Sequence, residues 1–398
     1  MSSLTSKALA PPRRPGASRR LAMWWGGHGL AQLVTIALVA AVLVLAGENI
    51  AETMRRIGVV PGFAFLGRSA NFEIGESVIA FRGGDPYALA ILAGFLNTLK
   101  VALAGCVLAT VLGVVLGVAG LSGNLLLASL VRAYVEFVRN TPLLLQLFFW
   151  IALAQAFPPP RRAISAFDAL LLTNRGVYVP SLTVHGFTTW TWVTLVVVLI
   201  VTVAALRLAR RDGAFHLRRS MLVVVLGIAA AAAAAPTTGA SLDLDLPTLA
   251  GFNIRGGHVL TPEFAALLTG LVVKFAAAIA EIVRAGIQSV DRGQREAARA
   301  MGLREMQIMR LVVLPQAMRV ITPLTTSSYL DLAKDSSLAV AIGYPDLVSV
   351  LNTTANTTGQ SLEALTIMIG AYLVLNLSIS FAMNLYNRRV VLRGATRA

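Results

Sequence analysis

The residue types that usually carry out chemistry are sparse in this sequence and do not share a spacing that would let them act together. The four histidines, at positions 28, 185, 216 and 258, stand singly without the short spacing of a metal site. Cys106 is the one cysteine, so neither an intrachain disulfide nor a cysteine metal cluster can form. A phosphate-binding loop requires a Gly-Lys pair, and the sequence contains none. We therefore expect this chain to have no catalytic residues, to bind no metal or cofactor, and to leave any ATP hydrolysis to a partner.

Three charged residues in an apolar part of the sequence do share a spacing. Asp331, Lys334 and Asp335 fall at i, i+3 and i+4, on one face of a predicted helix. An ionised side chain at mid-bilayer costs about 2.5–3.5 kcal/mol on insertion scales, so such residues usually face a bundle interior or an aqueous path. Two interpretations stay open. The three residues border a path for a solute, or they neutralise one another and fix helix packing.

Polar residues beside and upstream of this charged group belong to the same candidate path. Ser336 follows the group directly, and Asn97 and Thr98 lie in an earlier apolar segment. Asn97 and Thr98 either line the path or form hydrogen bonds between helices.

The most distinctive polar segment runs from Arg295 to Gln316, REAARAMGLREMQIMRLVVLPQ. Asp291 is suited to cap the first helix, with Gln294 three residues on as in a capping box. Gly302 can take the left-handed conformation that ends a helix, and Pro315 predicts a stop after a second short helix. The expected product is a compact helical knob that exposes small alanines and an acidic residue. It would suit close approach by another protein, although an amphipathic connecting helix without a partner is the alternative.

The elements that must position these residues are apolar. Hydrophobic residues make up 56% of the 398 and charged residues 13%, with a mean hydropathy of +0.73, which is typical of a polytopic membrane protein. The net charge of +15 does not indicate nucleic-acid binding, because the arginines lie between apolar runs where membrane topology explains them. We expect an all-α chain with about eight spans. They lie near Leu30–Ala46, Phe95–Ala119, Pro142–Phe157, Trp190–Leu208, Met221–Ala235, Phe264–Ala285, Val320–Ala333 and Leu362–Leu385.

The distribution of basic residues predicts the orientation. With both termini in the cytoplasm, 23 lysines and arginines fall inside and eight outside, which follows the positive-inside rule and places the knob in the cytoplasm. The first apolar run is preceded by some thirty residues, so it is expected to be an uncleaved signal anchor rather than a cleaved signal peptide. Residues 1–29 are expected to be a basic tail against the anionic inner leaflet, or else a peptide recognised by a partner.

The knob segment resembles the EAA loop of binding-protein-dependent ABC importer permeases. Val312 departs from the isoleucine usual in that family, and both residues are β-branched and apolar. The resemblance implies that the knob docks into a cleft on a cytoplasmic ABC ATPase, where ATP and Mg²⁺ would bind. The matching residues are Glu296, Ala297, Ala298, Gly302, Leu314 and Pro315.

Two further blocks resemble the polar amino-acid permeases. Gly94–Phe157 contains Tyr134–Leu144, which is similar to the family tract ending in Arg-Gly-Thr-Pro-Leu-Leu, with Asn140 in place of the glycine. The block from Phe264 to Arg389 contains runs similar to the family's Lys-(Ser/Asp)-(Thr/Ser)-Ser-Leu and Pro-Asp-Leu stretches. The extra first span and the insertion between the blocks resemble the general L-amino acid permeases of proteobacteria. The order along the chain is a basic tail (1–29), an anchor and periplasmic segment (30–93), the first core block (94–157), an insertion (158–262), the second core block (263–389) with the EAA loop at about 286–318, and a cytoplasmic tail (390–398).

These resemblances imply a multi-pass permease subunit in a bacterial inner membrane, with a type I ABC importer (MetI-like) core. Its partners would be an ATPase dimer, a second related permease and a periplasmic amino-acid-binding protein, and transport of polar or general L-amino acids would proceed by alternating access. The competing class is a secondary transporter driven by an ion gradient. That class predicts charged coupling sites in broken helices and an internal inverted repeat, and we find no convincing repeat.

Overall fold

The computed structural model describes residues 29–56, 62–166, 169–185 and 241–390, with position 58 and a few short stretches between 197 and 229. Among these described residues, four single helices are long and apolar enough to cross a membrane: α2 (Gly29–Arg56), α3 (Tyr87–Ala119), α8 (Pro262–Gln288) and α13 (Ser361–Val390). A further candidate span is a pair of helices bent by 105° at its break, α4 (Leu125–Asn140) and α5 (Leu143–Gln155). The predicted polytopic helical architecture is confirmed, whereas the predicted count of eight spans is not.

The remaining predicted spans have different outcomes. The predicted spans at Trp190–Leu208 and Met221–Ala235 lie outside the described residues except for short stretches, as do the predicted tails. The predicted span Val320–Ala333 lies within α11 (Leu314–Asp335), which is helical but contains Pro323 and is not apolar enough to count among the span candidates.

Helix α8 is the centre of the bundle. In its most apolar stretch 56% of the residues are buried, against 33% for α3 and none for α2. Helices α3 and α8 run in the same direction and approach closely, because a Cβ atom added at Gly113 would lie 2.7 Å from the Cβ atom of Ile279. At Gly117 an added Cβ would lie 2.8 Å from the Ala280 carbonyl oxygen. The glycine stripe of α3 therefore serves helix packing, as its spacing predicts.

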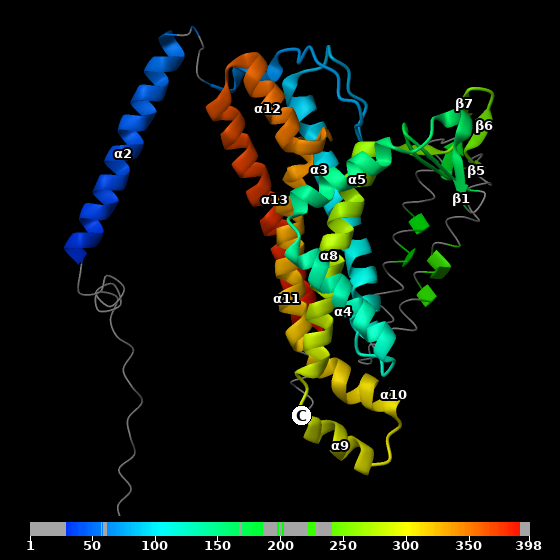
Figure 1. Cartoon of the computed structure of the whole chain (residues 1–398). Coiled ribbons are helices and arrows are strands. Elements are labelled where there is room, and N and C mark those ends of the chain that lie inside the picture. Colours follow the sequence, from blue (N-terminus) through cyan, green and yellow to red (C-terminus); the bar gives the residue numbers. More distant parts are fainter. Residues whose placement is uncertain are drawn as a thin grey trace, which may run out of the picture.

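Helix α11 returns in the opposite direction along this pair. Gly286 near the end of α8 contacts Ile321, and Gly105 of α3 contacts Leu332. The chain then forms a 3₁₀ helix, η6 (Ser336–Ile342), and a short helix, α12 (Leu347–Thr358), which packs against α3 and α13. Figure 1 shows α12 at the end of the bundle opposite α9 (Arg292–Ala300) and α10 (Glu305–Ile308).

The segment between α5 and α8 corrects the expectation of an all-α chain, because it contains short antiparallel strands. Strand pairing across this segment brings His185 beside Ser241, so that β4 and β5 join the two sides of the insertion. Turns of glycine and polar residues, such as Asn174–Gly176, connect strands of three to five residues in the described part of this segment. The sheet orders are β1-β2-β3-β8, β4-β5 and β6-β7. The strands are β1 (Ile164–Ala166), β2 (Leu170–Thr173), β3 (Gly176–Val179), β4 (Ser181–His185), β5 (Ser241–Asp245), β6 (Thr248–Ala250), β7 (Asn253–Arg255) and β8 (His258–Leu260).

Helix α2 stands apart from the bundle in Figure 1. Its aliphatic side chains are exposed along its length, as Leu38 and Leu45 illustrate, each 65% exposed. Such a surface suits the hydrocarbon of a bilayer, as expected of the predicted anchor.

Candidate functional site

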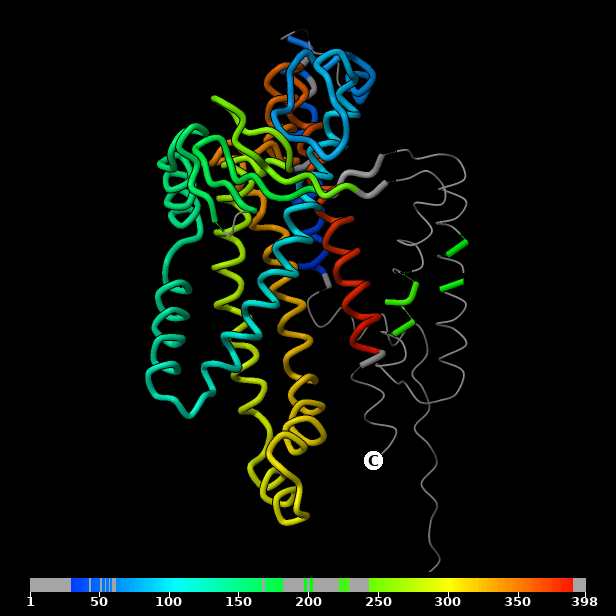
Figure 2. Tube along the Cα trace, turned by 90° about the vertical axis from the view of Figure 1, so that its right-hand side faces the viewer, coloured from blue at the N-terminus to red at the C-terminus, as the bar shows by residue number. Residues whose placement is uncertain are grey.

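The knob is a helical hairpin that follows α8, and we define it as residues 291–315. Its first helix is α9 (Arg292–Ala300), and the Asp291 side chain accepts a hydrogen bond of 2.6 Å from the backbone N–H of Gly293. The predicted N-cap is therefore confirmed. Figure 2 shows the hairpin projecting from one end of the bundle.

Helix α9 ends in a Schellman motif centred on Gly302, which has φ +77°. The N–H of Leu303 donates to the Ala298 carbonyl over 3.2 Å, and the N–H of Gly302 donates to the Arg299 carbonyl over 2.9 Å. The predicted left-handed break is confirmed. No atom lies within 4 Å of a Cβ added at Gly302, so backbone conformation alone requires glycine there.

The expected stop at Pro315 is wrong. Helix α10 (Glu305–Ile308) leads through a π-helical turn, η5 (Met309–Val313), directly into α11. The N–H of Leu314 reaches the Met309 carbonyl, which is five residues back, and Pro315 occupies the first turn of α11. In the first turn of a helix the missing N–H of proline costs no hydrogen bond, and the wide π turn before it leaves room for the ring. Pro315 therefore starts α11 instead of ending a helix.

One side of the knob is fixed to the bundle. Ala298 is 1% exposed and Ile308 2% exposed, and both belong to the same buried cluster as residues of α8 and α11. An Arg295 guanidinium nitrogen donates to the Ile287 carbonyl at the end of α8, over 2.5 Å. Ala298 therefore packs inward, although it belongs to the motif that the sequence associates with docking.

The other side of the knob is open. Glu296, Ala297, Leu314 and Pro315 are exposed. Large apolar side chains are exposed beside them, a pattern that marks protein interaction surfaces and is well served by adaptable methionines. They are Met301 at 72%, Met306 at 77%, Leu311 at 61% and Leu314 at 42%.

An ion pair joins the two short helices of the knob across the break. Arg299 Nε lies 2.7 Å from a Glu305 carboxylate oxygen, and this hydrogen bond lowers the pKa of Glu305. Both side chains are more than half exposed, so the pair aligns the helices and adds little stability.

At the opposite end of the bundle, the candidate path residues Asn97, Thr98 and Ser336 are buried and hydrogen-bonded. Asn97 Nδ2 donates to the carbonyls of Glu76 and Pro345, over 2.7 and 2.8 Å, and its Oδ1 accepts from the N–H of Val78 over 3.2 Å. With these three bonds, Asn97 ties the loop that precedes α3 and the start of α12 to α3, and we call this set of contacts the outer junction.

Thr98 and Ser336 lie near one another in this junction. Thr98 Oγ1 accepts from the N–H of Leu347 over 3.1 Å, and Ser336 Oγ donates to the Ala333 carbonyl over 2.8 Å. The Tyr372 hydroxyl of α13 faces both side chains. The arrangement brings together α3, η6, α12 and α13.

The charged candidates are more exposed than this buried junction. Lys334 Nζ is 3.7 Å from an Asp331 oxygen, and both side chains are about 60% exposed. Asp335 is half-buried and lies within electrostatic range of Lys274 of α8. The structure thus pairs Asp331 with Lys334 near the surface, whereas Asn97 and Thr98 are fully buried.

Glu76, which lies at the α12 end of the bundle, was not predicted from the sequence to take part in this site. Glu76 lies 2.5 Å from Lys100 Nζ of α3 and accepts a 2.5 Å hydrogen bond from Thr261, which caps α8. Lys100 also lies 4.1 Å above the Phe264 ring. An isolated lysine in an apolar run, such as Lys100, indicates an internal partner. The sequence does not show which one, because Glu76 lies in a loop 24 residues away. No group of histidine, cysteine or acidic residues in the described part of the chain could hold a metal ion.

Comparisons with known proteins give the family that this chain resembles. Residues 247–392 match the family model described as "Binding-protein-dependent transport system inner membrane component". A putative amino-acid ABC transporter permease, YhdX of Escherichia coli K12, is 43% identical over 91% of this chain and 94% of its own length. The general L-amino acid transport system permease AapQ of Rhizobium johnstonii is 38% identical over 91% of both chains. BztB of Rhodobacter capsulatus, a glutamate/glutamine/aspartate/asparagine transport system permease, is 36% identical over 90% of this chain and 94% of its own length.

Among solved structures, a crystal structure of an amino acid ABC transporter with histidines aligns with a TM-score of 0.45. The sequence identity is 21%, and the alignment covers 76% of this chain and 95% of that one.

Proposed function

Because this chain belongs to the permease subunits of amino-acid ABC transporters, the binding-protein-dependent inner-membrane components, we propose that it forms one half of a membrane pathway that imports L-amino acids. The family assignment favours an ABC importer over a secondary transporter driven by an ion gradient. The names of AapQ and BztB support general or polar L-amino acids as cargo.

The observation that carries the proposal is the two-sided knob. One side is anchored to α8 and α11 through Ala298, Ile308 and the Arg295 hydrogen bond, and the other exposes Glu296 and large apolar side chains. A rigid attachment with an open apolar face is what a coupling element requires, because a force applied at the face is passed to the helices. We propose that a cytoplasmic ABC ATPase dimer, with its ATP and Mg²⁺, docks on this face.

Movement of the knob would be transmitted mainly through α8 and α11. Helix α11 is continuous with α10 through the π turn, so displacement of α10 pulls directly on a helix that reaches η6 and the outer junction. ATP-driven closure of the ATPase dimer would therefore rock the bundle between inward and outward access.

The remaining partners complete the proposal. A second, related permease would enclose the pathway, because the relatives GltJ and GltK are both named as import permeases for glutamate and aspartate. A periplasmic binding protein would deliver the amino acid at the α12 end. The excess of basic residues on the knob side favours a cytoplasmic knob and cytoplasmic termini in a bacterial inner membrane.

The test is reconstitution. The chain is co-expressed with an ABC ATPase, a second permease and a binding protein encoded nearby, and proteoliposomes are assayed with a panel of labelled L-amino acids with and without ATP. We expect ATP-dependent uptake of at least one amino acid and co-elution of the ATPase with the permease. Uptake that needs an ion gradient and no ATP would contradict the proposal.

A further inference from the structure

A cavity of about 430 Å³ opens between α3, α4 and α8 at the knob end of the bundle. It is lined by the last turn of α3, the second half of α4 and the last third of α8. Arg284, one of its lining residues, lies seven residues before Asp291, where the knob begins. The volume falls within the roughly 300–1,000 Å³ of small-molecule sites in proteins.

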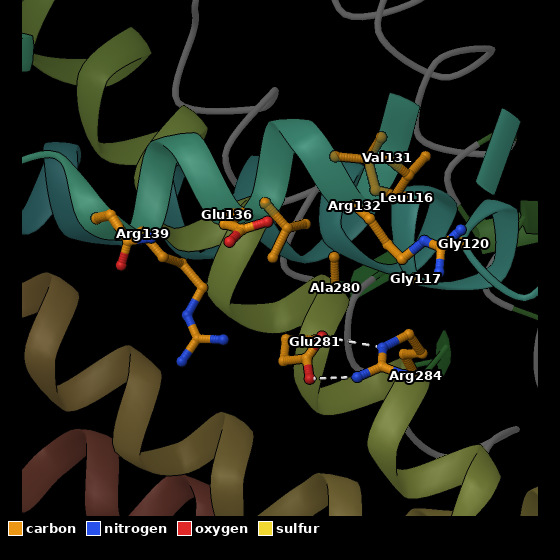
Figure 3. Close-up of a pocket in the computed structure, with 12 residues that line it drawn as sticks. Leu116, Gly117, Gly120, Val131, Arg132, Glu136, Arg139, Ala280, Glu281 and Arg284 are labelled. Atoms are coloured by element: carbon orange, nitrogen blue, oxygen red, sulfur yellow. Dashed lines mark hydrogen bonds and ion pairs between the residues drawn. The ribbon is translucent and has the colours of Figure 1, made fainter. Parts of the chain in front are cut away.

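Part of the lining of this cavity is aliphatic, and the rest is polar or charged. Leu116, Val131, Val135 and Ala280 contribute aliphatic surface, and Gly117 contributes backbone only. Figure 3 shows these residues around the space, with Arg132, Glu136 and Arg139 on one helix and Glu281 and Arg284 on another. The wall can therefore accept an aliphatic group, and the rim presents both signs of charge.

Part of this rim charge is satisfied internally. Two Arg284 nitrogens donate to the Glu281 carboxylate over 2.6 and 3.0 Å, which is a bidentate ion pair within α8. Arg132 bonds the Ala128 carbonyl and the Ser129 hydroxyl on its own helix. These two arginines are thus held by α8 and α4.

Glu136 and Arg139 are the remaining charged groups of the rim. Within the described part of the chain, Glu136 has no hydrogen bond and no ion pair, and Arg139 interacts only through the electrostatic field it exerts on Glu281. They are separated by one helical turn on α4, so both project toward the same side of that helix. A carboxylate and a guanidinium held about one turn apart, above an aliphatic wall, complement a small molecule that carries an ammonium and a carboxylate.

We propose that this cavity binds the zwitterion of an α-amino acid at the knob side of the permease. Glu136 accepts hydrogen bonds from the α-ammonium, Arg139 donates to the α-carboxylate, and the side chain lies along Val131 and Val135. The inference rests on the proposed function, to which it adds a site for the cargo on the exit side.

The mixture of charges favours an amino acid over an anionic lipid headgroup. A lipid phosphate beside Arg139 would also face the Glu136 carboxylate, which forms no ion pair in the described part of the chain, and like charges repel at this range. A zwitterion places its positive group against one carboxylate and its negative group against the guanidinium. Because the recognised groups are common to all α-amino acids and the wall is merely aliphatic, the site would discriminate weakly among side chains.

The experiment measures binding of radiolabelled L-glutamine to the purified permease–ATPase complex in nanodiscs, without binding protein and without ATP. We expect saturable binding that unlabelled glutamine competes for and that N-acetylglutamine, which lacks the ammonium, does not. Glu136→Gln and Arg139→Gln are each expected to weaken binding at least tenfold. The matched controls are Glu52→Gln and Arg56→Gln, which remove another Glu–Arg pair on the exposed end of α2 and should leave binding unchanged.

The outcomes separate the site from the transport function. If wild-type proteoliposomes import amino acids but Glu136→Gln and Arg139→Gln bind and transport like wild type, the site is overturned and the importer stands. If native mass spectrometry instead finds a phospholipid that is retained by wild type and lost from Arg139→Gln, the cavity is a headgroup site and the proposal fails. Co-elution of each variant with the ATPase checks that it has folded.

Discussion

At the knob end of the bundle, large apolar side chains face outward, whereas at the α12 end polar side chains are buried. Met306 is 77% exposed in the knob, and Asn97 at the opposite end is fully buried. The knob is held by a few contacts along one side. The outer junction is held by side-chain hydrogen bonds of Asn97 and Thr98, which connect α3 with the loop that precedes it and with the start of α12.

This difference indicates a division of labour. Burying the exposed methionines and leucines against a partner would be favourable, and flexible methionines adapt to a partner's surface. The knob is therefore suited to binding and to movement. Each buried polar group of the outer junction would cost about 1–3 kcal/mol if its partner were removed, so that end resists local rearrangement. Force entering at the knob would therefore tilt whole helices about a fixed outer junction.

The largest expected effect comes from Gly302→Pro, which tests the knob as a coupling element. Proline cannot adopt φ +77°, and it removes the N–H that bonds the Arg299 carbonyl. We expect uptake in proteoliposomes to be lost and ATPase co-elution to be greatly reduced, with membrane insertion intact. Gly302→Asn is the control, because asparagine tolerates the left-handed region and should retain most activity. Normal uptake by the proline variant would contradict the proposed coupling role of the knob.

Glu296→Lys tests the docking face itself. Glu296 is exposed and forms no ion pair within the described part of the chain, so its replacement changes the charge of the face without removing a packing contact. We expect uptake to fall at least tenfold and co-elution of the ATPase to weaken. Glu48→Lys on α2 makes the same change of charge far from the knob and should behave as wild type. Equal effects of the two substitutions would show that the knob has no special role.

Gly117→Ala tests whether the body between the two ends transmits force as a packed unit. The added methyl group would lie 2.8 Å from the Ala280 carbonyl oxygen and from Val283, so α3 and α8 must separate. We expect a loss of about 1–3 kcal/mol of stability, measured by thermal unfolding in detergent. Gly123→Ala adds the same methyl group where no atom lies within 4 Å and should have no effect.

Glu76→Gln tests the outer junction and should give the smallest effect. It leaves the Lys100 ammonium without its carboxylate, but that side chain is 29% exposed and stays above the Phe264 ring. We expect roughly 1–2 kcal/mol of destabilisation, less than for a fully buried pair, with ATPase co-elution unchanged. Adding Lys100→Met to Glu76→Gln should recover part of the stability. A loss of co-elution in the single variant would contradict the separation of the two ends.

Much of the knob could be predicted from local sequence, because local rules govern it. The Asp291 cap and the break at Gly302 depend on residues within a few positions of each other, and both are confirmed. Pro315 was misjudged because proline is equally acceptable in the first turn of a helix. Which role it takes depends on the backbone before it, and here a π turn leads into α11.

The outer junction could not be predicted in the same way. Asn97 and Thr98 were assigned either to a path or to bonds between helices, and the structure engages them with the loop that precedes α3 and the start of α12, about 20 and 250 residues away in the sequence. The strands of the insertion escaped prediction because each has only three to five residues, too short for a clear period-2 pattern.

The sequence by itself determined that this is a polytopic membrane protein with a helix-break-helix knob, because composition and the conformational preferences of glycine and aspartate act locally, and its permease motifs resembled those of a known family. The tertiary structure decided which side of the knob is open, that Ala298 faces inward, and which buried polar groups pair with each other. Those features depend on how helices distant in sequence pack together, and spacing along one chain does not specify that packing.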